Sequence, residues 1–191
     1  MAALPHAVEV TIELLLASPL HRYEGRPSDG PLDARGRELV DSIQVKAGLG
    51  IVGDRYFAQP AHRTASVTVF AAESLDHLAH TLGTGPLGPA SFDAASFDAA
   101  DTRRNIVVRG LPIDGMRGEE FSLDTGQGAV LFRAHRPANP CAWMDVVLAP
   151  GAHRALRGRG GMRCEPLTSG TLTLGPALAR TQSPPAALPL F

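Results

Sequence analysis

The sequence contains only two cysteines, Cys141 and Cys164, among its 191 residues. Two widely separated thiols cannot form a disulfide framework, and they are too few for a structural zinc site built on cysteines. A single disulfide between them would be unusual in a reducing compartment. The sequence leaves open whether these two thiols interact at all.

The chain also lacks a net charge of either sign and a long hydrophobic run. It carries 18 lysines and arginines against 19 aspartates and glutamates, so bulk charge cannot drive binding to nucleic acids or anionic membranes. The best apolar run, at 14–17, is far too short to cross a bilayer. We therefore expect a cytoplasmic chain with no nucleic-acid and no membrane partner.

Several catalytic signatures are absent as well. The sequence has no phosphate-binding P-loop and no G-x-S-x-G nucleophile elbow. Lys46 is the only lysine and therefore the only residue that could form a Schiff base, but no supporting motif surrounds it.

Glycine and proline are abundant, with 20 and 16 residues, while aromatic residues make up only 5% of the chain. Residues 8–14 alternate apolar and polar side chains, which predicts a half-buried strand. Residues 71–82 have leucines at helical spacing and end at a glycine, which predicts a helix. Further strands are expected at 42–45, 67–70, 106–108, 121–123, 129–134, 162–167 and 171–174, with short helices after Pro140 and at 152–156. Many short strands and few helices favour a mainly β fold, either a β-barrel or a sandwich with small helical insertions.

We expect one domain over residues 1–178, interrupted by a low-complexity inserted loop at 83–100. Within this loop the sequence ASFDA occurs twice in tandem, at 90–94 and 95–99. Two such short copies cannot stack a core of their own, so an exposed loop is expected rather than a repeat architecture. The Pro/Ala-rich residues 179–191 are predicted to form a loosely ordered C-terminal tail.

Residues 48–53 match the dinucleotide-binding pattern G-x-G-x-x-G letter for letter. That pattern requires a helix beginning at the glycines, whose amides meet the pyrophosphate. The following residues, 54–60, have no helical apolar repeat before a proline. We therefore interpret the segment as a tight turn that needs glycine, with Asp54 and Arg55 as a structural ion pair or a wall of a site.

Cys141 has the most informative surroundings. Asn139 is a favourable helix N-cap and Pro140 is favoured at the first helical position, which places Cys141 at the second. Free amides and the helix dipole favour an ionised thiol there, and the basic residues within 133–136 add positive potential. Cys141 is thus a candidate nucleophile, sulfur carrier or soft metal ligand. The alternative is a small buried hydrophobic residue, a common role of cysteine.

The remaining candidates are weaker. Cys164 lies in the strand-like stretch 162–165 with no helix start, which favours a packing role. His77 and His80 share a helix face, but no cysteine or acidic residue stands at ligand spacing beside them. A solvated helix face is therefore favoured over a zinc site.

Two basic segments suit an anionic ligand. Arg103, Arg104 and Asn105 precede the strand at 106–108, and guanidinium groups bind phosphate through a bidentate fork. The alternative is a solvated charged edge. Residues 157–161 (RGRGG), which include Arg159, resemble a short RGG tract. One copy in a neutral chain is weak evidence for RNA binding, so we expect a mobile loop, which could close over an anion.

Four segments, taken in order, resemble the MOSC domain, the family named after the C-terminal domain of molybdenum-cofactor sulfurase. They are 50–55 (GIVGDR), 103–110 (RRNIVVRG), Pro140-Cys141, and 159–161 together with 169–170. Residues 118–121 (GEEF) also fit the family pattern G-x-x-F at the start of a strand. Each motif is weak alone, but their order and spacing over 8–178 are more specific.

The resemblance implies a mainly β, barrel-like fold similar to the pyruvate-kinase β-barrel domain. It also implies a cysteine that carries sulfur or ligates molybdenum, and Cys141 stands at that position. Arg103 and Asn105 match family positions expected to contact the pterin-phosphate of the molybdenum cofactor (molybdopterin). Arg55 and Arg159 are weaker candidates for lining the same site.

The sequence departs from the family pattern at two places. Many relatives have a second cysteine three residues before the functional one, where this chain has Ala138. This departure argues against dithiol chemistry and leaves single-thiol ligation open. The family often has Gly-Asp near the last strand, where this chain has Gly175-Pro176, so that turn is altered.

Three functions follow from the resemblance. The first is a protein that binds the molybdenum cofactor. If it is an enzyme, the expected reaction is the reductive dehydroxylation of N-hydroxylated compounds, with electrons from a donor protein. The second hypothesis is a non-catalytic module that passes sulfur from a pyridoxal-phosphate-dependent desulfurase to an acceptor. The third is a domain that kept the fold and binds a thiol or small ligand without catalysis.

Overall fold

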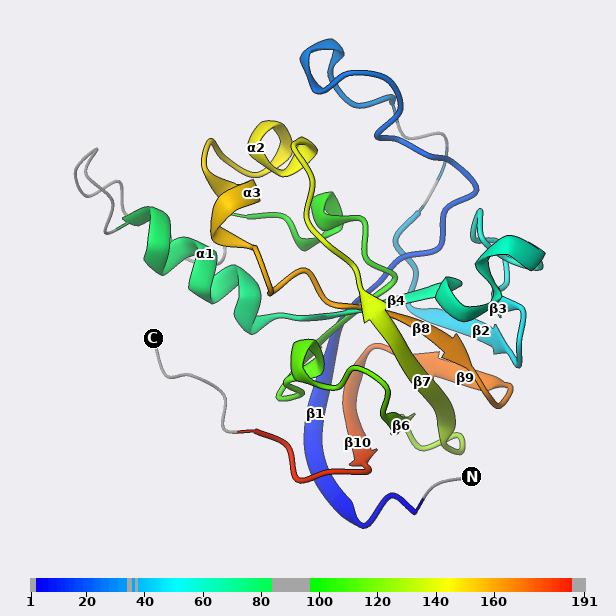
Figure 1. Cartoon of the computed structure of the whole chain (residues 1–191). Helices are drawn as coiled ribbons and strands as arrows, with labels where there is room; N and C mark the ends of the chain where they lie inside the picture. The colour runs from blue at the N-terminus through cyan, green and yellow to red at the C-terminus, as the bar shows by residue number, and fades with distance from the viewer. Residues whose placement is uncertain (1–2, 34–35, 37, 84–96, 187–191) are drawn as a thin grey trace.

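The computed structural model describes residues 3–33, 36, 38–83 and 97–186 (Figure 1). Most of the expected inserted loop at 83–100, including the first copy of the duplication, lies outside the described residues. Within the described part of the chain, no helix is both long and apolar enough to span a membrane.

Seven strands form a closed barrel in the order β1-β10-β6-β7-β8-β4-β5. The barrel closes because β1 pairs with β10 on one side and with β5 on the other. All neighbours are antiparallel except the parallel pair β4 and β5. The strands are β1 (His6–Leu15), β4 (Val67–Ala71), β5 (Ile106–Arg109), β6 (Glu120–Asp124), β7 (Val130–Pro137), β8 (Met162–Pro166) and β10 (Gly175–Thr181). The expected mainly β, barrel-like fold is confirmed.

A small three-stranded sheet lies beside the barrel, in the order β3-β2-β9 (Figure 1). Its strands are β2 (Ser42–Lys46), β3 (Gly50–Ile51) and β9 (Gly170–Thr173). Ile43, Ile51 and Leu172 from this sheet belong to the same buried hydrophobic cluster as the barrel interior. The two sheets therefore share one core, and burial of that apolar surface is the main force that holds them together.

Three short helices cover one side of the barrel: α1 (Glu73–Gly83), α2 (Trp143–Val147) and α3 (Ala152–Ala155) (Figure 1). They form a second hydrophobic cluster, which includes Phe70 of β4 and Val107 of β5. Because β4 and β5 pack against the barrel core on one face and the helices on the other, successive residues are buried instead of alternating between buried and exposed. Short 3-10 helices occur at Pro27–Asp29 (η1), Pro60–Ala65 (η2), Ala99–Thr102 (η4) and Ile113–Gly115 (η5).

The glycine-rich segment at 48–53 makes a tight turn, as predicted, and no helix follows it. Its first residues join β2 to β3, and Gly50, the first residue of β3, has a φ of +105°. A Cβ atom at Gly50 would lie 2.9 Å from the Cβ of Ser66. Both the left-handed conformation and the close neighbour require glycine here, so the turn is structural.

The strand β10 departs from the sequence expectation. It runs from Gly175 to Thr181, so the barrel continues three residues past the expected domain boundary at 178. Its proline and two alanines resemble a loose tail, so local composition does not reveal the strand. Pro176 is tolerated because the pairing of β10 with β6 begins only at Leu178, so β6 needs no N–H group from Pro176.

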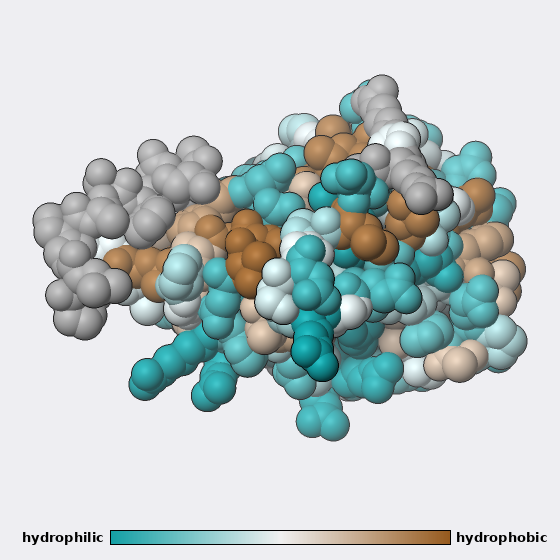
Figure 2. Space-filling model, turned by 90° about the horizontal axis from the view of Figure 1, so that it is seen from above, coloured by the Kyte–Doolittle hydropathy of each residue, from teal (hydrophilic) through white to brown (hydrophobic). Residues whose placement is uncertain are grey.

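Hydrophobic residues on the molecular surface are dispersed. The face seen in Figure 2 carries several separate hydrophobic areas between hydrophilic side chains. The exposed large hydrophobic residues of the described chain come from different elements and loops: Leu32, Leu39, Leu49, Val52, Val146, Leu174 and Leu178. Isolated exposed hydrophobic residues are normal for a protein surface and need no functional explanation.

Candidate functional site

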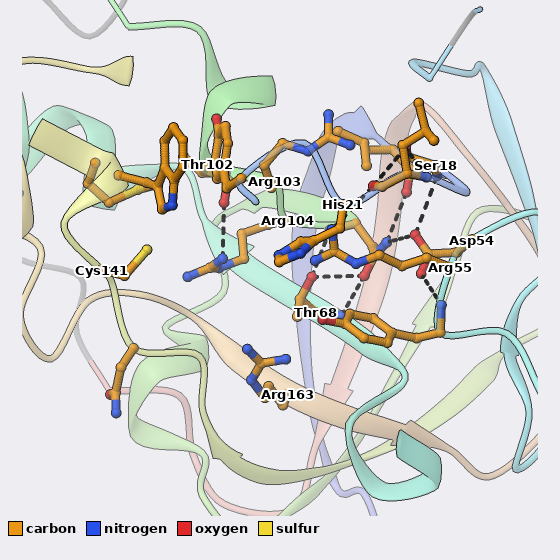
Figure 3. Close-up of a pocket in the computed structure, with 18 residues that line it drawn as sticks. Ser18, His21, Asp54, Arg55, Thr68, Thr102, Arg103, Arg104, Cys141 and Arg163 are labelled. Atoms are coloured by element: carbon orange, nitrogen blue, oxygen red, sulfur yellow. Dashed lines mark hydrogen bonds between the residues drawn. The ribbon is translucent and has the colours of Figure 1, made fainter. Parts of the chain in front are cut away.

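A pocket of about 320 Å³ contains four of the five residues proposed from the sequence: Arg55, Arg103, Asn105 and Cys141. The pocket is bordered by the chain after β1, the segments that precede β5 and α2, and strand β8 (Figure 3). Its volume lies at the lower end of the range typical of small-molecule sites. Arg159 does not line this pocket, and its charge acts instead on Asp114 and His77.

Cys141 is a free, solvent-exposed cysteine in the segment between β7 and α2. The expected helix start at Asn139 is wrong, because α2 begins at Trp143 and Ala142 is its N-cap. The backbone carbonyl of Cys141 accepts a hydrogen bond from Met144 N (2.9 Å), so Cys141 precedes the first turn. Since α2 has only five residues and starts after Cys141, its N-terminus does not provide the positive potential expected near the thiol. Any positive charge beside Cys141 must come from side chains.

Arg104 supplies a fixed positive charge beside this thiol (Figure 3). Its Nε donates to the carbonyl of Gly160 (2.8 Å), its Nη1 to that of Thr102 (3.0 Å) and its Nη2 to that of Ala138 (2.7 Å). A guanidinium has five N–H donors, so two remain after these three bonds. Three carbonyls from separate segments therefore hold Arg104 in one orientation and leave part of it open to a ligand.

Burial and then the nearby charge of Arg163 lower the pKa of Arg104 to about 10, while the charge of a Cys141 thiolate opposes that shift. Arg104 remains protonated at neutral pH. The direction of these effects shows that the two guanidiniums repel each other and that an ionised Cys141 would attract Arg104.

Two glycines make the Arg104 arrangement possible. A Cβ atom on Gly160 would lie 2.3 Å from the carbonyl oxygen of Ala138, and one on Gly161 would lie 2.3 Å from that of Val69. Gly161 also has a φ of +82° and donates its N–H to a carboxylate oxygen of Asp114 (2.7 Å). The second half of the RGRGG segment is thus packed tightly against the barrel, which differs from the mobile loop expected from its composition.

Arg163 projects into the same pocket from strand β8 (Figure 3). Its neighbours Met162 and Cys164 are buried in the barrel interior, so the alternation of the strand turns Arg163 outward. Among the described residues, its guanidinium has no hydrogen-bond or ion-pair partner. Arg163 is a half-buried positive charge with no counter-ion in the part of the chain that the structure describes.

Arg103, in contrast, is committed to the protein. Its Nη1 and Nη2 donate to the two carboxylate oxygens of Glu38 at 2.8 and 2.9 Å. Both side chains are largely buried, at 6% and 9% exposure. Burial alone would raise the pKa of Glu38, but hydrogen bonds from Arg103 and Ser18 outweigh burial and lower it. This ion pair ties the long loop after β1 to the segment before β5.

Asn105 is equally committed. Its Oδ1 accepts from the Thr68 backbone N–H (2.9 Å) and hydroxyl (2.8 Å), and its Nδ2 donates to Leu16 O (3.1 Å) and Asp54 Oδ2 (2.9 Å). These four bonds use the full hydrogen-bonding capacity of the amide. Asn105 therefore joins β4, β5 and the end of β1, and positions the pocket wall.

Asp54 and Arg55 form part of that wall. The Asp54 carboxylate accepts from Tyr56 N (3.0 Å) and Ser18 N (3.4 Å) as well as from Asn105. Burial nevertheless raises the pKa of Asp54. Arg55 donates to Leu20 O (3.2 Å) and lies over the ring of Tyr56 at 4.6 Å from its centroid. The two residues make separate contacts, which fits a site wall better than a simple ion pair.

Two aromatic side chains line another side of the pocket. The Tyr23 and Trp143 rings are stacked, with centroids 5.0 Å apart and planes inclined by 13°. The Tyr23 hydroxyl donates to Asp101 O (2.5 Å), and burial followed by the charge of Asp101 raises its pKa. The hydroxyl therefore stays protonated, and the pair forms a rigid apolar wall.

The sequence motifs point to Arg103 and Asn105 and not to Arg104 between them, and they do not identify Arg163, Tyr23 or Trp143 as pocket residues. No local pattern marks these residues, because the pocket brings them together from distant segments. The alternating strand at 162–166 was the one available signal, since it predicts that Arg163 faces away from the barrel core.

The other titratable candidates play no part in this pocket. Cys164 is fully buried in the barrel, and burial raises the pKa of its thiol, which keeps it protonated. Both cysteines are free thiols. Among the described residues, no group of three or more His, Cys, Asp or Glu side chains is arranged to hold a metal ion, so His77 and His80 form no such site.

Comparison with known proteins shows which fold this is. The YuaD protein from Bacillus subtilis superposes with a TM-score of 0.62 at 17% identity, over 92% of this chain and 97% of that one. YiiM from Escherichia coli superposes with a TM-score of 0.54 at 15% identity, over 89% of this chain and 69% of that one. At these identities the likeness concerns the fold alone.

A search of curated proteins finds no significant match. A sequence model of the MOSC domain, however, matches residues 53–178. This match covers well over half of the chain, including β4 to β9, Arg104, Cys141 and Arg163. The chain belongs to the MOSC domain family.

Proposed function

We propose that this chain acts in the cytoplasm as a molybdenum-cofactor protein in which the Cys141 thiolate ligates the metal. The MOSC family is associated with this cofactor. The observation that carries the proposal is the position of Cys141: a free, exposed thiol at a pocket that the Arg104 guanidinium also lines. The thiolate is the form of cysteine that binds metals.

The donor set fits a cofactor better than a bare metal ion. The described residues contain no cluster of three or more protein ligands, so Cys141 can contribute only one. A metal bound here must therefore bring its other ligands with it, as a pterin-bound metal does. The pocket also suits an anionic group, because Arg104 and Arg163 carry charge that no carboxylate in the pocket wall balances.

Each side of the pocket would have a separate role. Cys141 would bind the metal, while the stacked pair Tyr23 and Trp143 would pack against a planar part of the ligand. Arg103 and Asn105, the positions that match the family's cofactor contacts, would act through the walls that they hold in place. Arg55, which lies over the ring of Tyr56, would form part of the pocket wall.

If the protein is catalytic, we propose the reduction of N-hydroxylated compounds. The reaction takes up two electrons and two protons, breaks the N–O bond, and yields the amine and water. When bound, the metal centre supplies the electron chemistry, and a separate electron-donor protein supplies the electrons. The exposed position of Cys141 leaves the pocket open to a small substrate.

The test is the molybdenum content of protein purified from a host that makes the cofactor. The wild-type chain should contain molybdenum and a pterin, and Cys141→Ser should lose most of the metal because serine is a poor substitute for a thiolate. Cys164→Ala is the matched control, since it removes the other thiol from inside the barrel and should keep the metal. Equal metal content in the wild type and Cys141→Ser would contradict the proposal.

The exposure of Cys141 also supports a second candidate, a sulfur carrier that receives sulfur from a pyridoxal-phosphate-dependent desulfurase. A partner's persulfide can reach an exposed thiol, and transfer would leave the persulfide on Cys141 and a thiol on the partner. Mass spectrometry of metal-free protein incubated with such a desulfurase should then find one added sulfur on Cys141. Sulfur acceptance by Cys141→Ser would exclude this role.

A further inference from the structure

The hydroxyl groups of the pocket wall have few protons to offer a reaction. The reduction proposed above takes up two protons, so a side chain that releases a proton near neutral pH is needed at the pocket. Four hydroxyls of the wall already donate within the protein: Ser18 to Glu38, Tyr23 to Asp101 O, Thr68 to Asn105 Oδ1 and Thr102 to Ala99 O. The remaining hydroxyl, on Tyr56, is a phenol, and a phenol is a much weaker acid than an imidazolium.

The charged groups of the wall are equally unsuitable as proton donors. The Asp54 carboxylate is buried and accepts three hydrogen bonds from N–H groups. Guanidiniums keep their protons at neutral pH, and Cys141 is the proposed ligand of the metal. Among the described residues that line the pocket, this leaves the imidazole of His21. Histidine is also the residue type that ordinarily exchanges a proton between pH 5 and 8.

His21 is held in place by its backbone while its side chain stays available. It lies in the loop after β1, and its ring projects toward the pocket from a different side than Cys141 (Figure 3). The carbonyl of the preceding residue, Leu20, accepts from Arg55 Nη1 (3.2 Å) and from the Ser18 hydroxyl (3.3 Å). Neither ring nitrogen of His21 has a hydrogen-bond partner in the described part of the chain. The side chain is exposed, so water can return a proton to it.

The surroundings of His21 make its protonated ring a stronger acid. Burial and then the charges of Arg55 and Arg103 lower the pKa of His21, while the charge of Glu24 opposes this shift. A lowered pKa means that the imidazolium releases its proton more readily. The other ionisable groups that face the pocket, from the neighbouring elements, are Tyr23, Asp54, Tyr56, Arg104, Cys141 and Arg163.

We propose that His21 is the proton donor of the reaction, a role that rests on the proposed function. The imidazolium gives its ring proton to the hydroxyl oxygen of the N-hydroxylated compound as the N–O bond breaks, and that oxygen leaves as water. The two electrons come from the donor protein by way of the metal centre. The nitrogen takes the second proton from solvent, which also returns a proton to the exposed ring. General acid catalysis of this kind avoids the release of hydroxide.

The test compares the pH dependence of phenylhydroxylamine reduction by the cofactor-loaded wild type and by His21→Gln. The wild-type kcat should fall as the pH rises through the lowered pKa of His21, because the ring then loses the proton that it donates. His21→Gln should lose this pH dependence, and its kcat should fall by about 100-fold. Its KM and its molybdenum content should stay close to the wild-type values, because the side chain makes no hydrogen bond within the described protein.

His80→Gln is the matched control. His80 is exposed on α1 and does not line the pocket. This variant makes the same substitution at another exposed histidine and should keep the wild-type kcat and pH profile. An equal loss of activity in His80→Gln would overturn the inference.

A measurement on the metal-free chain examines His21 without the reaction. An NMR titration should contain one histidine signal that is absent from His21→Gln and that titrates below pH 6.5. A ring that stays neutral down to pH 4 would have no proton to donate and would overturn the inference.

The failure of this inference differs from the failure of the proposed function. A wild type without molybdenum would overturn both. Wild-type metal content together with an unchanged rate and pH profile in His21→Gln would overturn the role of His21 alone. Loss of molybdenum from His21→Gln would also overturn it, because the residue would then hold the cofactor instead of donating a proton.

Discussion

The pocket wall has two halves built on opposite principles. On the side of Arg103 and Asn105, nearly all polar groups bond within the protein, through a bidentate pair with Glu38 and four bonds around one amide; the buried Nε of Arg103, which has no partner among the described residues, is the exception. On the side of Arg104, Arg163 and Cys141, donors and a thiol are left open to the cavity. The saturated half stabilises the fold, and the unsaturated half has the capacity to bind.

Neighbouring residues in the sequence fall on different sides of this division. Arg103 and Arg104 are adjacent, yet one guanidinium bonds to a carboxylate and the other to three carbonyls. The left-handed conformation of Arg103, with a φ of +56° at the end of η4, turns the chain between them. A substitution in each half should therefore separate stability from binding.

The largest effect on stability is expected for Asn105→Ala. Removing the amide leaves buried partners on Thr68, Leu16 and Asp54 without their bonds. Each unsatisfied buried group costs of the order of 1 kcal/mol or more, so the free energy of unfolding should fall by roughly 3 kcal/mol. Urea denaturation measures this change. A loss below about 1 kcal/mol would show that the hydrogen bonds of Asn105 contribute little to the stability of the fold.

Gly160→Ala is expected to have the next largest effect and to act on both halves. Its new Cβ would collide with the Ala138 carbonyl, which also holds Arg104. Overpacking of this kind costs about 1–3 kcal/mol, and the displaced carbonyls should release the Arg104 guanidinium. Urea denaturation and titration with phosphate, a test anion for the pocket, should both change when measured on the same preparation. Normal phosphate binding by a destabilised variant would show that the carbonyls do not position Arg104.

Glu38→Gln tests the ion pair through its pH dependence. Because the folded-state pKa of Glu38 lies below the ordinary value of 4.5, its ionised form stabilises the fold above about pH 4.5, and this contribution is lost as the pH falls through the lowered pKa. At pH 7 the variant should lose about 1.5 kcal/mol of unfolding free energy. The difference from the wild type should shrink on acidification below pH 4.5. A difference that stays constant down to pH 3 would contradict the assignment.

The smallest effect on stability is expected for Arg163→Gln, which breaks no bond within the described protein. Its unfolding free energy should stay within about 0.5 kcal/mol of the wild type. Thermal unfolding in phosphate provides the contrast: added phosphate should stabilise the wild type more than the variant, because only a bound ligand shifts the equilibrium. A large intrinsic loss of stability would place Arg163 among the structural residues.

The sequence predicts the fold where local patterns dominate. The alternation at 8–14 lies within β1, and the leucine spacing at 71–82 corresponds to α1. The strand β10 escaped because Pro176 and its alanines resemble a tail, and only the pairing with β1 and β6 explains why they are ordered. The helix start near Cys141 was misplaced because the Asn-Pro signal is local, whereas α2 is fixed by packing of Trp143 in the helical cluster.

The site was predictable only in part. The family motifs led to Cys141 and to the segment 103–105, and both border the pocket. Local sequence cannot show that Glu38 neutralises Arg103 while Gly160, Thr102 and Ala138 hold Arg104. These partners lie far apart along the chain and meet only when the barrel closes. Which arginine is free to bind is therefore a property of the fold.

The most direct test of the account is the alkylation of the two cysteines before and after cofactor loading, followed by mass spectrometry. In metal-free protein, iodoacetamide should modify Cys141 and leave Cys164, which is buried in the barrel. In cofactor-loaded protein, Cys141 should be protected, because its sulfur is engaged by the metal. Alkylation of Cys141 at the same rate in both forms would contradict its role as the ligand.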